Sequence, residues 1–120
     1  QIKYDETGKC YYFTASYPAF NNVNNGYDRI VLRKADSIQE LSDDNGGKDK
    51  EITIWKAPAD GKMSRHVWAP ELQKINGKWY VFFAAGNSDN IWAIRPYVLV
   101  CQNNEDPYNE ESWKLGDGSY

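Results

Sequence analysis

The feature that most constrains the fold is an internal repeat of a strand–turn–strand unit. The segment GKCYYFTAS, which starts at Gly8, matches GKWYVFFAA, which starts at Gly77. Two further matches follow each copy in the same order, RIVLRKA with PYVLVCQ and ITIWK with ESWKL. Together with the strand that precedes each hairpin, each unit contains four strands. A repeated four-stranded antiparallel sheet is typical of the blades of a β-propeller.

Short apolar or alternating runs bounded by Gly, Asn, Asp and Pro dominate the sequence, so we expect an all-β chain. Asn76-Gly77 predicts a two-residue type I′ hairpin, because that turn needs positive φ at both positions. Polar residues at 21–26 and 43–50 predict loops, the second exposed and mobile. The predicted strands are residues 1–4, 9–16, 28–34, 51–56, 71–75, 78–86, 96–102 and 111–115.

The repeat predicts one partial propeller domain over residues 1–120. Blade one is expected at about 1–60 and blade two at about 61–120. Two blades cannot close a ring, since propellers have at least about four, and open blades would expose apolar faces and strand edges. We therefore expect the chain to be a piece of a larger propeller, or to pair with a second chain that supplies the other blades.

The composition excludes several classes of function. Hydrophobic residues make up 41% and charged residues 26%, as in a globular protein. Fourteen Lys and Arg against seventeen Asp and Glu form no basic stripe for nucleic acid, and the apolar runs are too short to span a membrane. Cys10 and Cys101 have no metal or redox spacing, so two buried thiols are expected rather than a disulfide. We predict no cofactor, no metal site, and no nucleic-acid or membrane partner.

Aromatic residues make up 15% of the chain, including five Trp and nine Tyr. Strands and sheet cores favour aromatic side chains, which explains most of them. Some are candidates for stacking against a ligand with flat apolar faces, for which a sugar is the usual candidate.

Several segments together resemble glycoside hydrolase family 43, most closely its α-L-arabinofuranosidase branch. They are YYFTASYP (11–18), YDRIVLRKADSIQEL (27–41), ITIWKAP (52–58), HVWAPELQKINGKWYVFFAAG (66–86) and RPYVLVC (95–101). The resemblance implies the first two blades of a five-bladed propeller. It also implies inverting hydrolysis that releases terminal arabinofuranose from arabinan or arabinoxylan, in a secreted or periplasmic protein, with no signal visible in this chain. A β-xylosidase or endo-arabinanase of the same family, or a non-catalytic carbohydrate-binding propeller, stays open.

The resemblance further implies where the catalytic carboxylates lie. In the family, an Asp followed by Pro begins the innermost strand of blade one and acts as the base. Pro70 stands seven residues before Gly77, and in the first copy the seventh residue before Gly8 is Gln1, so the position that matches Ala69, where the base is expected, falls just ahead of Gln1. The Asp that tunes the pKa of the acid, and the general acid Glu, belong to later blades beyond Tyr120. We expect none of the three in this chain, and no activity from the isolated chain; nothing around Asp117 resembles the tuning motif.

Candidate sugar-binding residues stand at the ends of the hairpin strands. Trp68 is expected to line the sugar site, with core packing as the alternative. Glu71 is expected to be a wall carboxylate that bonds neighbouring backbone, rather than a sugar ligand or a catalytic group. Small residues near Ala84 would let a furanose approach the backbone. The full set of substrate-binding candidates is Trp68, Glu71, Phe83, Ala85, Ser16 and Tyr17.

Expectations also follow for four other charged or titratable residues. His66 has no partner for a metal site or a catalytic triad, so it is expected at the rim or in a structural role. Asp28 and Arg29 are expected to form a structural ion pair or turn contact, and Arg95 is placed within reach of the rim.

Overall fold

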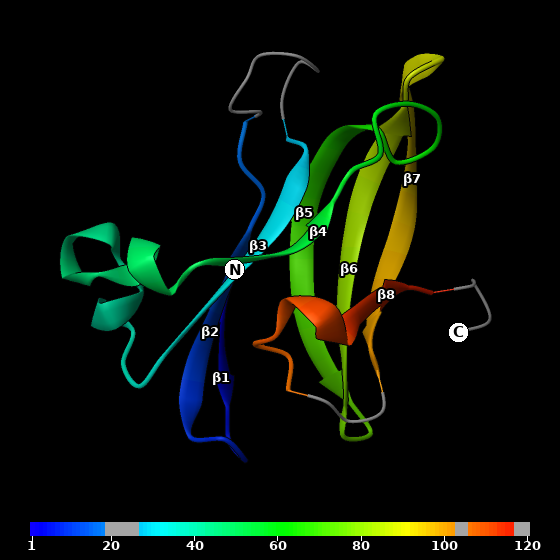
Figure 1. Cartoon of the computed structure of the whole chain (residues 1–120). Coiled ribbons are helices and arrows are strands. Elements are labelled where there is room, and N and C mark those ends of the chain that lie inside the picture. Colours follow the sequence, from blue (N-terminus) through cyan, green and yellow to red (C-terminus); the bar gives the residue numbers. More distant parts are fainter. Residues whose placement is uncertain (19–26, 103–105, 117–120) are drawn as a thin grey trace.

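The computed structural model describes residues 1–18, 27–102 and 106–116, and these form two four-stranded antiparallel sheets (Figure 1). The first sheet contains, in spatial order, β1 (Ile2–Asp5), β2 (Cys10–Ala15), β3 (Arg29–Ala35) and β4 (Ile52–Lys56). The second contains β5 (Arg65–Ile75), β6 (Lys78–Asn87), β7 (Asn90–Cys101) and β8 (Trp113–Leu115). Each sheet has the consecutive strand order of a propeller blade, which confirms the all-β prediction and the repeat.

The hairpins follow from local sequence. Asn76 and Gly77 both have positive φ, 51° and 77°, which confirms the predicted turn between β5 and β6. β5 and β7 begin earlier than predicted, at Arg65 and Asn90. β6 and β7 are joined by a short turn, with Asn87 paired to Asn90, so both strands extend past the predicted ends.

The core lies between the two sheets, which stand face to face in Figure 1. Tyr12 of β2 packs edge-on against Trp79 of β6, with ring centroids 5.4 Å apart. Burial of each aliphatic side chain contributes about 1.5–3 kcal/mol, so this shared core holds the two blades together. No disulfide joins Cys10 and Cys101, and both are buried, as predicted. The fully buried aliphatic residues of the core cluster are Ile30, Leu32, Val67, Leu72, Val81 and Leu99.

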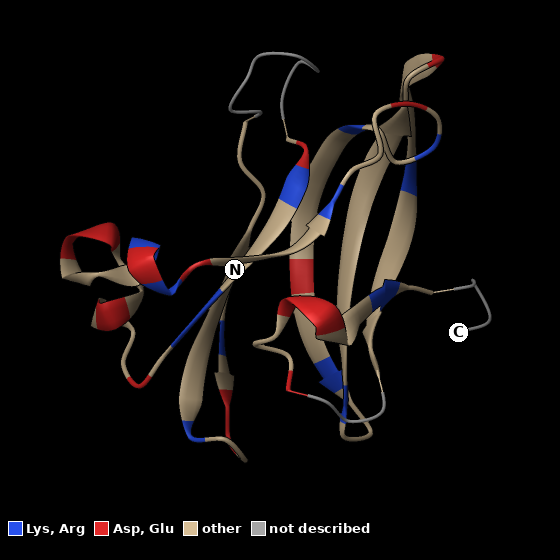
Figure 2. Cartoon of the chain, viewed as in Figure 1, with Lys and Arg blue, Asp and Glu red and all other residues tan. Residues whose placement is uncertain are grey.

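The segment predicted as a loop at 43–50 instead forms 3-10 helices. η1 (Gln39–Leu41), η2 (Asp43–Asn45) and η3 (Gly47–Lys50) follow one another beside the first sheet, and Figure 2 shows charged residues gathered on them. Sequence patterns missed these turns because their stabilising contacts are not local. Arg33 of β3, 4% exposed, donates to the Leu41 carbonyl at 2.7 Å and thereby holds η1 against the sheet.

Polar contacts fasten the two sheets along the edge where β1 and β5 meet. The Gln1 side chain accepts from the Leu72 amide at 2.6 Å and donates to the Leu72 carbonyl at 3.4 Å. Lys74 lies 3.3 Å from Asp5 and forms an ion pair with it. A further contact joins Tyr108, which precedes η5 (Glu110–Ser112), to the carbonyl of Lys50. Among the described residues, no helix is long and apolar enough to cross a membrane.

Candidate functional site

The first half of β5 contains two β-bulges. From Arg65 to Trp68, and again from Trp68 to Glu71, β5 moves along by three residues while its partner β6 moves along by two. Each interval therefore contains one extra residue of β5, which defines a β-bulge. One residue in each bulge, His66 and Ala69, has positive φ, 51° and 52°. That conformation costs about 1–2 kcal/mol for a residue with a Cβ. Backbone strain of this kind persists where the surroundings impose it, and it is enriched at functional sites.

Four aromatic rings gather at this end of the molecule, and we name them the rim cluster: Tyr27, His66, Trp68 and Trp92. The imidazole of His66 contacts both indoles, with its centroid 4.5 Å from Trp68 and 5.1 Å from Trp92, and the two indole centroids are 6.4 Å apart. Tyr27 meets Trp68 edge-on at 6.4 Å. His66 is buried, Trp68 is half-buried and Trp92 is 69% exposed, so the stack runs from the protein interior to its surface.

His66 combines burial with unmet polar groups. The residue is 8% exposed, and both ring nitrogens, Nδ1 and Nε2, are buried without a hydrogen-bond partner. They are the only such side-chain atoms among the residues that the structure describes. A buried polar group without a partner costs about 1–3 kcal/mol. The fold therefore tolerates a penalty to keep an imidazole against the two indoles.

Backbone contacts fix the rim cluster to the first sheet. The Val67 amide donates to the Tyr27 carbonyl at 3.0 Å, and the Ser16 hydroxyl donates to the Val67 carbonyl at 2.5 Å. Gln1 and Thr14 exchange two backbone hydrogen bonds, at 2.9 and 3.0 Å, so the β1–β2 ladder reaches Gln1. Ser16, two residues after Thr14, therefore lies close both to β5 and to the start of β1.

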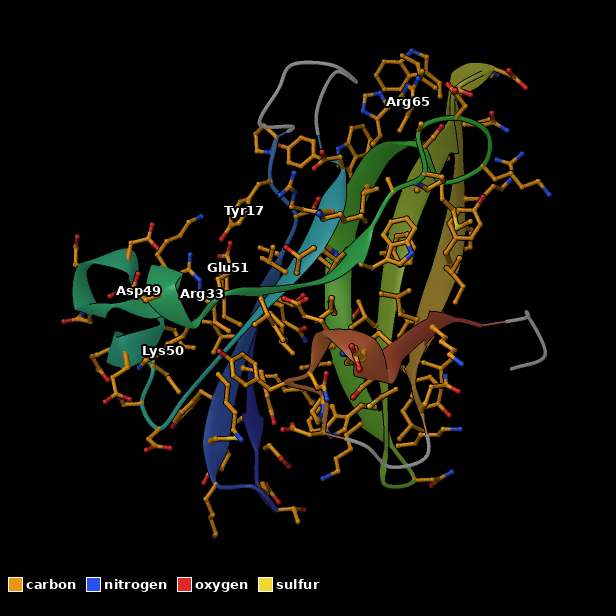
Figure 3. All side chains as sticks on the ribbon, viewed as in Figure 1. Tyr17, Arg33, Asp49, Lys50, Glu51 and Arg65 are labelled. Carbon is orange, nitrogen blue, oxygen red and sulfur yellow. The ribbon has the colours of Figure 1, made fainter. Side chains whose placement is uncertain are left out.

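The structure does not bring all the predicted residues to this cluster. Phe83 and Ala85 are 4% and 0% exposed and belong to the core, where Phe83 packs 4.9 Å from Trp55; they present no surface to a ligand here. The Tyr17 hydroxyl donates to Glu51 at 2.8 Å and accepts from Arg33 at 3.1 Å. Figure 3 shows these three labelled side chains in one region of the first sheet. Burial, followed by the bond to Glu51, raises the pKa of Tyr17 to about 12.

Two carboxylates have clear partners. Glu71 is exposed and accepts a hydrogen bond from the Gln73 side chain at 2.5 Å, so it does not bond neighbouring backbone as predicted. Asp28 and Arg29 form the predicted ion pair, with Oδ1 and Nε 2.9 Å apart. The hydrogen bond from Arg29 lowers the pKa of Asp28. Arg95 is exposed and donates to the Ile94 carbonyl.

Sequence reasoning missed Tyr27 and Trp92. The signal for Trp92 was the short apolar run IWAI after the polar turn residues NSDN, which is typical of a strand that continues a hairpin. The described residues contain no group of three His, Cys, Asp or Glu that could hold a metal ion. The rim cluster itself offers flat aromatic faces and an imidazole but no carboxylate, a set suited to binding rather than proton transfer.

Comparison with known proteins shows which family the chain matches. A model described as Glycosyl hydrolases family 43 matches residues 1–119. An extracellular exo-α-(1→5)-L-arabinofuranosidase of Streptomyces avermitilis is 48% identical over 80% of this chain and 18% of its own length. α-L-arabinofuranosidase 43 of Humicola insolens is 46% identical over 74% of this chain and 16% of its own length. The crystal structure of an α-L-arabinofuranosidase from Lactobacillus brevis superposes with a TM-score of 0.69 at 35% identity, covering 95% of this chain and 33% of that one. The chain thus spans a third or less of each relative.

Proposed function

Because the chain belongs to glycoside hydrolase family 43, we propose that it supplies two blades of an enzyme that releases terminal α-L-arabinofuranose outside the cell. The observation that carries this proposal is the high identity, over most of the chain, to proteins named arabinofuranosidases. The named α-(1→5) linkage of the Streptomyces relative makes arabinan the first substrate to test. We use "the complete protein" for the whole polypeptide that carries this chain.

The proposed reaction is hydrolysis with inversion at the anomeric carbon. A carboxylate base takes a proton from water while the water oxygen attacks the anomeric carbon from the face opposite the leaving group. A carboxylic acid donates its proton to the departing glycosidic oxygen. The two carboxyl groups stand about 6.5–9.5 Å apart to leave room for the water. We assign the base to an Asp directly ahead of Gln1 and the acid to a later blade.

Trp68 and Ser16 are the residues of this chain that we assign to the sugar site. The proposed base would extend the β1–β2 ladder past Gln1, opposite Ala15 and next to Ser16. The Ser16 hydroxyl bonds the carbonyl of Val67, which directly precedes Trp68. The half-buried indole of Trp68 therefore lies near the proposed position of the base. An apolar ring there suits the C–H face of a furanose, whose hydroxyls bond elsewhere.

The proposed partners within the protein are further blades. Large apolar residues are exposed on both sheets: Ile2 and Tyr4 on the first, at 49% and 44%, and Phe82 on the second, at 39%. Such residues are typical of a surface that packs against another sheet. The contacts between the two blades described here, an apolar core with polar bonds at the edge, give the pattern for the others.

The test uses the complete protein with two sets of substrates, α-(1→5)-linked arabino-oligosaccharides and β-(1→4)-linked xylo-oligosaccharides. We expect release of arabinose with inverted configuration, followed by proton NMR of the first product. Replacing the residue ahead of Gln1 by Asn or Ala should abolish turnover, and Trp68→Ala should lower kcat/KM by about tenfold or more. Exclusive cleavage of xylo-oligosaccharides would replace the arabinofuranosidase proposal with a xylosidase. Binding without hydrolysis would make the protein a carbohydrate-binding propeller.

A further inference from the structure

Trp92 is held rigidly although it is exposed. At 69%, it is the most exposed large hydrophobic residue of the described chain. One face of the indole stacks on His66, at 5.1 Å and an interplanar angle of 26°. Its backbone amide donates to the Asn90 side chain at 3.2 Å. A Cβ added to Gly86 would stand 2.4 Å from the Ile91 carbonyl, so the strand that carries Trp92 lies tightly against β6.

The turn that leads into the strand of Trp92 is polar. The β6–β7 turn beside it consists of Asn87, Ser88, Asp89 and Asn90. An interface with another sheet is expected to be continuous and apolar, as between the two sheets described here. An exposed flat aromatic face on a strand that follows a turn of amide, hydroxyl and carboxylate residues instead matches a sugar ring, which has an apolar C–H face and polar hydroxyls around its edge.

We propose that Trp92 is a stacking platform for the sugar unit on the leaving-group side of the scissile bond, and that His66 positions it. This inference rests on the proposed function. The indole centroids of Trp92 and Trp68 are 6.4 Å apart, so one oligosaccharide can contact both. The half-buried Trp68 takes the terminal furanose. Trp92 takes the next unit, because an enzyme that removes terminal sugars leaves the rest of its substrate directed toward solvent.

His66 supports Trp92 from the interior of the rim cluster. It touches both indoles, and no hydrogen bond to either nitrogen is present to explain its burial. The ring's shape and position, rather than its nitrogens, therefore keep the open face of Trp92 in place. Phe at this position should preserve the stack, whereas Ala should release it.

The experiment compares two substrates of the complete protein: methyl α-L-arabinofuranoside, which has no second sugar, and α-(1→5)-arabinotriose. Trp92→Ala should lower kcat/KM for the triose by roughly tenfold, which corresponds to the loss of one stacking contact of about 1.4 kcal/mol. The same variant should change kcat/KM for the methyl glycoside by less than about twofold. Trp92→Tyr should retain most of the triose activity. His66→Ala should reproduce the selective loss and His66→Phe should not. Ile75→Ala, an exposed apolar residue at the opposite end of β5, serves as the control and should leave both substrates unaffected.

Equal losses on both substrates would overturn the inference, because Trp92 would then serve the terminal sugar or the fold. A lowered melting temperature with unchanged kinetics would also overturn it and assign the indole to a contact with another blade. These results are distinct from failure of the proposed function, in which the unaltered complete protein would hydrolyse neither arabinose substrate.

Discussion

Substitution of Glu51 tests how the 3-10 helices are held to the first sheet. Its carboxylate is 11% exposed and forms an ion pair with the guanidinium of Arg33, which is 5% exposed, at 2.9 Å. The same oxygen accepts the Tyr17 hydroxyl at 2.8 Å. Figure 3 shows the three side chains converging between the sheet and the helices. Glu51→Ala would leave a buried cation with Asp43, which is 70% exposed, as its remaining charged partner, and with the Leu41 carbonyl and the Tyr17 hydroxyl as neutral acceptors.

Removing one member of a buried ion pair typically costs 3–5 kcal/mol. Asp43 remains 2.7 Å from Arg33, so we expect the lower end, about 3 kcal/mol, for Glu51→Ala. Glu51→Gln keeps an acceptor oxygen and should cost about half of that, since a charged hydrogen bond is about twice as strong as a neutral one. Lys48, which is 53% exposed and 3.4 Å from Glu51, gives the control: Lys48→Ala should cost under about 1 kcal/mol.

The measurement is urea unfolding of the complete protein, followed by tryptophan fluorescence. A shift of the midpoint at unchanged slope reports stability. The double variant Arg33→Met with Glu51→Ala should lose less than the sum of the two single losses, because no uncompensated charge stays buried. The reasoning is refuted if Glu51→Ala costs no more than Lys48→Ala, or if the two single losses simply add.

Three further predictions concern local geometry. The raised pKa of Tyr17 contributes stability that is complete below pH 10 and is lost as the pH rises from 10 to about 12. The difference in unfolding free energy between the unaltered protein and Tyr17→Phe should therefore shrink over that pH interval, as measured by urea unfolding. Gly47→Ala places a Cβ 2.0 Å from the Leu41 carbonyl and should cost about 1–3 kcal/mol in the same assay, whereas an unchanged midpoint would show that η1 and η3 can separate freely. Ala69→Gly removes the steric strain of a Cβ at positive φ but gives the backbone beside the rim cluster more freedom. The two effects on stability nearly cancel, so the melting temperature should be nearly unchanged, while kcat/KM should fall. Asn76→Gly, the matched change at a turn, should not alter kcat/KM, and equal kinetics for both variants would contradict a positioning role for Ala69.

The fold was largely predictable because its signals are local. Turn residues such as Asn76-Gly77 and alternating runs identify hairpins without knowledge of the rest of the chain. The early part of β5 was missed because its two bulges each insert a residue, at His66 and Ala69, and so break the alternation on which strand prediction depends. The 3-10 helices were missed because the contacts of Arg33 come from a strand outside the segment.

The site was less predictable, and the reason is the two-residue period of a strand. Val81, Phe83 and Ala85 face the core, whereas Phe82 and Ala84 lie on the other face of β6. A shift of one residue exchanges the two sets, and only the packing of one sheet on the other decides which set is buried. The sugar site at the hairpin end therefore stays a prediction, and two of its candidate residues, Phe83 and Ala85, are buried in the described core.

The distribution of backbone strain supports the assignment of function to the rim end. Non-glycine residues with positive φ occur at both ends of the described sheets. At one end they are Lys9 and Asn76, which lie in hairpin turns where such φ values are needed to reverse the chain. Of the others, Tyr27 and Met63 lie outside the strands, whereas His66 and Ala69 lie within β5, where no reversal requires them, and the buried nitrogens of His66 add a second cost at the same place. Local rules are broken mainly where function demands it, so the coincidence of strain, unpaired nitrogens and an exposed indole favours this end as the one that meets the substrate.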